Sequence, residues 1–306
     1  MFDIKKALDK VVAQMSQVIL GKELQIRLAL TCLMARGHVL IEDQPGVGKT
    51  TLAHALVRVL GLSFQRIQFT SDLLPADILG VSIYDKAVAQ FKFHPGPIFA
   101  QMVLADEVNR ATPKTQSALL EAMEEHQVTV EGETRPLPVP FFVLATQNPL
   151  HQIGTFPLPE SQLDRFMMRL ELGYPDHSTE RALLKGQDRR EIIAKVTPTL
   201  TIQALSDIQK AVPQVHVADA LIDYLQAILE FSRQSSRYRA GLSPRAGLAV
   251  LHCAQAWALM HGRNHVVPED VQTVLPGVIG HRLAAMAEQQ NSQALVKQLI
   301  EKVAIP

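Results

Sequence analysis

The chain has 306 residues, which is long enough for two domains, and 47% of them are hydrophobic, so it can bury substantial cores. Its 30 lysine and arginine residues balance 30 aspartate and glutamate residues, which leaves no overall field to recruit nucleic acid or an anionic membrane surface. The first ten residues lack the apolar core of a signal peptide, and no apolar run approaches the roughly 20 residues that span a bilayer, so we expect a cytoplasmic protein.

Residues 2–36 have helical spacing that is interrupted at residues 18–21. A short apolar segment that ends in glycine before a strand could wrap an adenine base, because a flat heterocycle needs an apolar cleft with backbone polar groups. Ile19 and Gly21 are therefore candidate nucleotide-binding residues. The alternative interpretation is a simple turn between two helices.

A phosphate-binding loop is predicted next. Residues 39–41 form an apolar run typical of a buried strand, a Pro-Gly turn follows, and residues 52–60 have helix-period spacing. Backbone N–H groups of such a loop, together with the positive end of the following helix, bind phosphate. Lys49 would reach the β- and γ-phosphates of ATP, and the Thr50 hydroxyl would ligate Mg²⁺. The candidate ATP-binding residues are Pro45, Gly46, Val47, Gly48, Lys49, Thr50 and Thr51.

One residue departs from the pattern G-x-x-x-x-G-K-[ST], because Asp43 stands where the first glycine is expected. A carboxylate that faced the triphosphate would be repelled. We therefore predict that the Asp43 side chain turns away from the phosphates. An ordinary strand-turn-helix connection is the alternative to a phosphate loop.

Two acidic residues follow a later strand. Residues 64–69 are predicted as a strand, 70–80 as a polar loop, 83–93 as a hairpin and 102–105 as a strand that runs into Asp106 and Glu107. Acidic residues at the carboxyl end of a buried strand face the ligand crevice of an open α/β sheet. We predict that Asp106 holds Mg²⁺ through water and that Glu107 is the general base for the water that attacks the γ-phosphate. The alternative is that the next helix favours both carboxylates through its dipole.

The rest of the core follows the same order of strand and helix. Thr112 and Pro113 begin a helix, residues 127–137 form a second hairpin, and strand 141–145 ends near Asn148. Asn148 is placed to orient the attacking water, although local turn chemistry is its alternative role. A fifth strand covers residues 167–172.

After a boundary at residues 174–175 the pattern is helical to the end. One helix begins Ser243-Pro244-Arg245, with serine as N-cap. Arg245 therefore lies in a first helical turn, where a cation opposes the helix dipole and invites an anionic partner. Cys32 and Cys253 lie in apolar helical patterns, and we expect two buried thiols in different domains.

Together these motifs resemble those of an AAA+ ATPase, and several strings resemble the MoxR family within that class. The strings are residues 41–53, 96–99, 104–123, 145–149, 163–166, 243–246 and 267–271. The resemblance implies an α/β fold in which residues 1–173 form a five-stranded parallel sheet, with the phosphate-loop strand central and helices on both faces. It also implies an all-α lid, residues 174–306, packed over the nucleotide.

The same resemblance implies roles for three polar residues. Asn148 matches sensor 1, Arg245 matches sensor 2, which contacts the γ-phosphate from the lid, and Arg165 matches an arginine finger donated to the neighbouring subunit's nucleotide. By itself Arg165 would be expected to pair with Asp164 or Glu160 on a solvated face. A finger that acts in trans requires a homo-oligomeric ring, which we expect to be a hexamer.

The implied function is Mg-dependent ATP hydrolysis that drives remodelling or maturation, including metal insertion, of partner proteins with von Willebrand factor A-type domains. The hairpins at 83–93 and 127–137 are extra to the ATPase core and would contact the partner or shape the ring. A nucleic-acid motor or loader is one alternative, but the only basic residues in the hairpins are Lys86, Lys92 and Arg135. A slow regulatory ATP switch is the other.

Overall fold

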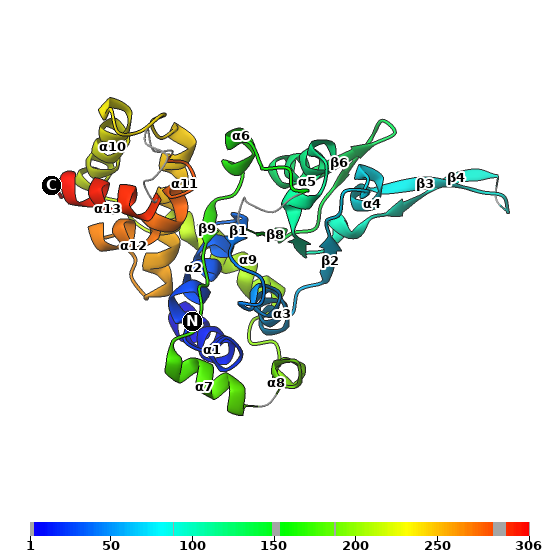
Figure 1. The fold of residues 1–306 in the computed structure, drawn as a ribbon, viewed down its shortest axis with the longest axis horizontal. Helices are drawn as coiled ribbons and strands as arrows, with labels where there is room; N and C mark the ends of the chain where they lie inside the picture. The colour runs from blue at the N-terminus through cyan, green and yellow to red at the C-terminus, as the bar shows by residue number, and fades with distance from the viewer. Residues whose placement is uncertain (1–2, 88, 149–153, 187, 284–291, 306) are drawn as a thin grey trace.

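A parallel sheet organises the first half of the chain (Figure 1). The computed structural model describes residues 3–87, 89–148, 154–186, 188–283 and 292–305. Its five parallel strands lie in the order β2 (Phe64–Gln68), β5 (Met102–Asp106), β8 (Phe142–Gln147), β1 (Val39–Glu42) and β9 (Met168–Leu170). The phosphate-loop strand β1 is an inner strand, paired on both sides, but the middle strand of the five is β8. The connections after β1 place β2 and β5 beyond β8, and only β9 pairs with the other side of β1.

Helices cover both faces of the sheet, as predicted, because successive strand side chains point to opposite faces. Val39 and Ile41 belong to a buried cluster with α1 (Ile4–Val18), α2 (Glu23–Met34) and α3 (Lys49–Leu60). Leu40 belongs to a second cluster with α4 (Pro75–Leu79) and α5 (Pro113–Glu125). The segment 70–80, which was expected to be a polar loop, thus contains a short helix; it begins at Pro75, and its Asp77 carboxylate accepts the Leu74 N–H at 2.9 Å.

Two antiparallel hairpins leave the sheet where alternation predicted them. The first, β3 (Gly80–Asp85) with β4 (Gln90–Pro95), extends far from the body of the protein (Figure 1). The second pairs β6 (Gln127–Val130) with β7 (Glu133–Pro136). The hairpins touch, since the Arg135 guanidinium lies 4.0 Å from the centroid of the Phe93 ring. Short 3-10 turns, η1 (Pro97–Phe99) and η2 (Val108–Arg110), flank β5, and α6 (Glu160–Leu163) precedes β9.

The second half of the chain is helical, as predicted. In order, its helices are α7 (His177–Lys185), α8 (Arg189–Lys195), α9 (Ile202–Ala211), η3 (Val212–Gln214), α10 (Asp219–Gln234), α11 (Pro244–Met260), α12 (Pro268–Ile279) and α13 (Ser292–Lys302). Helix α8 packs on α3 and α1, whereas α11 packs on α2, and α12 packs on β9. Helix α8 therefore lies beside the phosphate-loop helix, and α12 lies at the β9 edge of the sheet.

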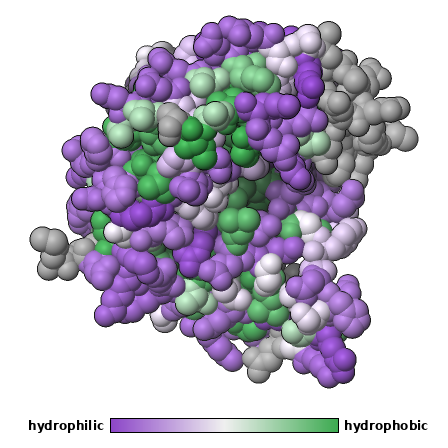
Figure 2. Space-filling model, turned by 90° about the vertical axis from the view of Figure 1, so that its left-hand side faces the viewer, coloured by the Kyte–Doolittle hydropathy of each residue, from purple (hydrophilic) through white to green (hydrophobic). Residues whose placement is uncertain are grey.

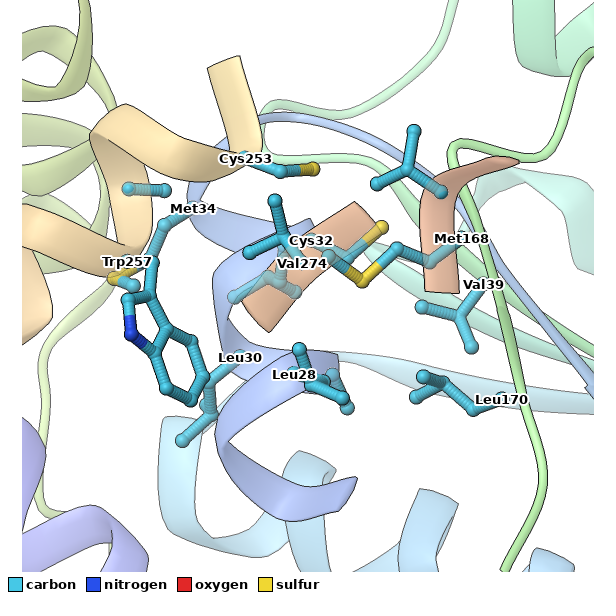
Figure 3. Close-up of a cluster of buried hydrophobic side chains, with 14 of the residues drawn as sticks. Leu28, Leu30, Cys32, Met34, Val39, Met168, Leu170, Cys253, Trp257 and Val274 are labelled. Atoms are coloured by element: carbon cyan, nitrogen blue, oxygen red, sulfur yellow. The ribbon is translucent and has the colours of Figure 1, made fainter. Parts of the chain in front are cut away.

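One hydrophobic core joins both halves. Figure 3 shows Cys32 and Met34 of α2 with Cys253 and Trp257 of α11 in a single buried cluster. Both cysteines are fully buried free thiols, as expected, and burial raises the pKa of Cys253 to about 12. The two thiols, which were expected in different domains, belong to one buried cluster because α11 packs directly on α2. The domain boundary near residue 174 stays a prediction.

The surface on the side of α10 to α13 is mostly hydrophilic, with hydrophobic residues gathered around a hollow (Figure 2). Among the residues that the structure describes, no helix is both long and apolar enough to cross a membrane.

Candidate functional site

The carboxyl ends of the parallel strands meet at one edge of the sheet, and this edge carries the predicted phosphate loop. Gly46 and Gly48 have φ angles of +86° and +100°, in the region that favours glycine. A Cβ atom at either position would meet nothing within 4 Å, so the backbone conformation and not crowding demands glycine. Gly48 is the N-cap of α3, whose first N–H groups are available to an anion.

Asp43 holds the loop to the neighbouring strand. Its Oδ2 accepts the backbone N–H groups of Leu172 and Gly173 at 2.7 and 2.6 Å, and its Oδ1 accepts that of Gln44 at 2.7 Å. The prediction that this side chain turns away is confirmed. Its function is structural, because it fastens the start of the loop to the segment that follows β9.

Three predicted residues form a continuous chain of hydrogen bonds. The Lys49 Nζ donates to Asn148 Oδ1 at 2.9 Å and to the Asp43 carbonyl oxygen, and Asn148 Nδ2 donates to Glu107 Oε1 at 3.0 Å. Burial lowers the pKa of Lys49 from its ordinary value of 10.5, while the nearby carboxylates, Asp43 and Asp106 foremost, oppose that shift. The arrangement brings a lysine ammonium, an amide and a carboxylate into contact.

The Asp106 carboxylate is buried beside this chain, and Thr146 connects it to Glu107. Asp106 Oδ1 accepts from Thr146 Oγ1 at 2.5 Å, and Asp106 Oδ2 accepts from Arg66 Nη2 at 2.6 Å. The Thr146 hydroxyl also accepts the Glu107 N–H at 2.9 Å, which supports the left-handed backbone of Glu107 (φ 57°). Gln68 Nε2 donates to Glu107 Oε2 at 3.0 Å.

Sequence reasoning missed Arg66, Gln68 and Thr146. The available signal was the polar pair Arg66 and Gln68, two residues apart on one side of a strand adjacent to the acidic strand. Thr146 carried no signal, because a threonine in a buried strand is ordinary.

The donor set suits Mg²⁺ together with phosphate. Among the described residues, no group of three or more His, Cys, Asp or Glu could hold a metal ion. Mg²⁺ is usually bound through one or two carboxylates and substrate phosphates, so such a cluster is not needed. The Asp106 carboxylate and the Thr50 hydroxyl supply the hard oxygen ligands that it prefers. Thr50 and Thr51 lie in the first turn of α3, directly after Val47, Gly48 and Lys49.

The predicted adenine segment is linked to the phosphate loop through residues 172–179. Ile19 is buried at the end of α1, and Gly21 has a φ angle of +67°. A Cβ atom on Gly21 would lie 2.9 Å from Thr179 Oγ1 of α7. Lys22 Nζ donates to the Tyr174 carbonyl oxygen at 2.9 Å. Leu172 and Gly173, which directly precede Tyr174, donate their N–H groups to Asp43.

Arg165 and Arg245, the two predicted arginines, lie together at Glu124 and not at the phosphate loop. Arg165 Nη1 donates to the Leu120 carbonyl oxygen and pairs with Glu124 Oε2, both at 2.9 Å, and Arg245 Nη1 pairs with Glu124 Oε1 at 3.1 Å. The partner of Arg165 is therefore Glu124, not Glu160 or Asp164. Ser243 caps α11 as predicted, since its side chain accepts the Ala246 N–H at 3.1 Å.

Both arginines line a cavity of about 220 Å³ at the amino edge of the sheet, beside Gly37 and His38, which precede β1. Lys49 lies beyond the carboxyl end of β1, and a four-residue strand spans about 13 Å. Arg245 therefore does not reach the phosphate loop of its own chain. The expectation that Arg245 contacts a γ-phosphate is therefore not met within one subunit, because α11 packs on α2.

Comparisons with known proteins agree with this architecture. Residues 38–168 match the model of the ATPase family associated with various cellular activities (AAA), and residues 230–302 match an AAA lid domain. The chain is 44% identical to the uncharacterised protein YeaC of Bacillus subtilis, over 99% of this chain and 96% of the relative. It is 38% identical to Chaperone MoxR1 of Mycobacterium tuberculosis, over 98% and 82%.

Two further likenesses extend over nearly the whole chain. Protein MoxR of Paracoccus denitrificans is 31% identical, over 94% of this chain and 92% of that protein. A crystal structure of a protein from Cytophaga hutchinsonii that is named as an ATPase superposes on this chain with a TM-score of 0.91 at 34% identity. The match covers 99% of this chain and 96% of the other chain.

Proposed function

This chain belongs to the MoxR family of AAA+ ATPases, and on that premise we propose that it hydrolyses Mg·ATP at the carboxyl edge of its sheet. The observation that carries the proposal is the chain of hydrogen bonds from Lys49 through Asn148 to Glu107. It joins a group that binds phosphate, a group that can orient water and a group that can accept a proton.

Each residue has a defined role in this proposal. The N–H groups after Gly46 and the Lys49 ammonium bind the phosphates, and Asn148 orients the attacking water. Glu107 accepts the proton of that water. Mg²⁺, held by Asp106 and Thr50, would neutralise charge on the phosphate oxygens. Ile19 and Gly21 are proposed to contact the adenine.

We further propose that Arg165 and Arg245 serve the nucleotide of a neighbouring subunit. Both lie at the edge of the sheet opposite their own phosphate loop, so a second copy must present its γ-phosphate to them. A contact between unlike edges is heterologous, and it gives a closed ring when the rotation between successive subunits closes. We propose a homo-oligomeric ring, a hexamer, in which each arginine pair completes the next site.

The work of the ring is proposed to be chaperone-like remodelling of a partner protein in the cytoplasm, and the relative named Chaperone MoxR1 supports this class of function. The first hairpin is the proposed contact surface, because its side chains Ile83, Tyr84 and Phe91 are 51%, 48% and 73% exposed. Partners with von Willebrand factor A-type domains, including enzymes that receive a metal, remain the proposed client class.

The test is the ATPase rate against protein concentration for wild type, Arg165→Ala, Glu107→Gln and an equal mixture of the two variants. We expect the wild-type rate per subunit to rise with concentration. Arg165→Ala should be nearly inactive because a trans arginine contributes roughly 10³ to 10⁵ in rate, and Glu107→Gln should be nearly inactive because it lacks the proton acceptor. The mixture should recover activity, because a Glu107→Gln subunit donates Arg165 to an intact Glu107. A flat wild-type rate, with Arg165→Ala as active as wild type, contradicts the proposal.

A further inference from the structure

Glu124 lines the cavity of about 220 Å³ that Arg165 and Arg245 also line, which we call the arginine cavity. It lies in the last turn of α5, and its two carboxylate oxygens bind different arginines: Oε2 is 2.9 Å from Arg165 Nη1, and Oε1 is 3.1 Å from Arg245 Nη1. Arg165 lies between α6 and β9, whereas Arg245 lies in the first turn of α11. One side chain therefore ties the end of a core helix to both arginines.

The charges around the cavity make this carboxylate distinctive. Among the described residues that line it, four are arginines and two are acidic, which are Arg36, Arg165, Arg245, Arg282, Glu124 and Asp164. Asp164 is committed mainly to Arg282, whose Nε lies 2.6 Å from Asp164 Oδ1, while Arg245 Nε lies 3.8 Å from Asp164 Oδ2. Glu124 is thus the main counter-charge of the two arginines that the ring would use.

A carboxylate and a phosphate are alternative partners for the same guanidinium groups. Both anions accept paired N–H bonds from the planar fork of arginine. The side chains of Glu124, Arg165 and Arg245 are 35%, 30% and 47% exposed, so solvent screens these pairs and they can exchange partners at modest cost. A phosphate with more negative charge would compete well for both arginines.

We propose that Glu124 is an intramolecular competitor for the neighbour's γ-phosphate, an inference that rests on the ring function proposed above. In the separate subunit it binds Arg165 and Arg245 and keeps them from non-productive anions. On assembly, the phosphate of the adjacent subunit replaces it. Because Arg245 belongs to α11, this exchange also breaks a contact between α11 and α5, which couples nucleotide in one subunit to the lid of the next.

The experiment measures ATP-dependent assembly in the Glu107→Gln background, in which bound ATP should persist. Sedimentation velocity with Mg·ATP gives the protein concentration at half-assembly for this parent and for the same chain with Glu124→Gln added. Removing the competing charge should lower that concentration about fivefold or more, given two screened ion pairs. Glu125→Gln, which changes the adjacent exposed carboxylate on the same helix, is the matched control and should leave it unchanged.

A further variant separates competition from simple packing effects. Arg245→Ala removes a proposed phosphate contact and weakens assembly by itself, so the effect of Glu124→Gln is measured both with Arg245 and in an Arg245→Ala chain. If the carboxylate acts by restraining Arg245, Glu124→Gln should lower the half-assembly concentration much less in the Arg245→Ala chain. Thermal unfolding of each variant, without nucleotide, verifies that the chains remain folded.

The outcomes are distinct. If the parent assembles with ATP and needs Arg165, but Glu124→Gln assembles at the same or a higher concentration, Glu124 does not compete and only this inference fails. If the parent does not assemble with ATP, or assembles equally well with Arg165→Ala, the ring function fails and the role of Glu124 fails with it.

Discussion

Asp43 offers the sharpest test of how the phosphate loop is built. Restoring the usual first glycine with Asp43→Gly removes a carboxylate that accepts two part-buried N–H groups, those of Leu172 and Gly173, at 2.7 and 2.6 Å. A part-buried hydrogen bond of this kind contributes roughly 1 kcal/mol net, so the two contribute about 2 kcal/mol. The third bond, to Gln44, is exposed and adds little. Glycine adds up to about 1 kcal/mol of backbone entropy.

We therefore expect Asp43→Gly to lower the free energy of unfolding by about 2 to 3 kcal/mol, measured by urea denaturation. We also expect weaker ATP binding in titration calorimetry, because the loop loses its attachment to the segment after β9. Asp43→Asn is the matched control: it keeps one oxygen acceptor without the charge, and its loss of stability should be about half as large. If Asp43→Gly binds ATP more tightly and is as stable as wild type, the carboxylate repels phosphate and does not anchor the loop.

Three other predictions concern different parts of the molecule. Thr146→Val removes the hydroxyl that bonds both the Glu107 N–H and Asp106 Oδ1. We expect kcat to fall at least about tenfold with little change in ATP affinity. Thr146→Ser keeps the hydroxyl and should retain most activity. Gly48→Ala forces a side chain into a backbone φ of +100°, so it should lower the free energy of unfolding by about 1 to 3 kcal/mol and weaken nucleotide binding. Gly37→Ala is the comparison: its φ is ordinary, so it should perturb packing against Met167 and leave nucleotide affinity unchanged. Burial lowers the pKa of His38 from 6.5 to about 4, so between these pH values the unfolded chain binds more protons than the folded chain. The free energy of unfolding should therefore fall as the pH drops through this window, by about 2 kcal/mol from this residue at pH 5. A urea midpoint that is equal at pH 7 and pH 5 would contradict this prediction.

The sequence predicted what depends on local pattern. Residues 39–60 specify strand, turn and helix through apolar spacing and two glycines, and the structure has β1, the turn and α3 there. Asp106, Glu107 and Asn148 were found because parallel strands place their carboxyl ends at one edge. These signals lie within a few residues of each group that they describe.

What the sequence did not predict depends on packing between distant segments. Strand order is decided by which strands pair, and no local spacing told that β8 would lie between β5 and β1. The first-turn position of Arg245 predicted only an anionic partner, and its placement at the γ-phosphate came from the family resemblance. The position of α11 is fixed by its packing on α2. The contacts of Glu124 were missed for the same reason, since its partners Arg165 and Arg245 lie 41 and 121 residues away in the sequence.

The direction of the strands favours a head-to-tail assembly, as a ring requires, over a symmetric pair. Residues that follow β1 hold the phosphate loop, and residues that precede β1 and β9 border the arginine cavity, so one subunit has a phosphate-binding edge and an arginine edge on opposite sides. A two-fold dimer through the arginine cavities would bring Arg165 of each copy toward its equivalent, and like charges would repel. The arginines of one subunit meet the negative charge of a bound phosphate only when the arginine edge faces the phosphate-binding edge of another subunit. Such a contact leaves both outer edges unpaired until the chain of subunits closes, and the proposed action of Arg165 in trans would then make every site depend on its neighbour.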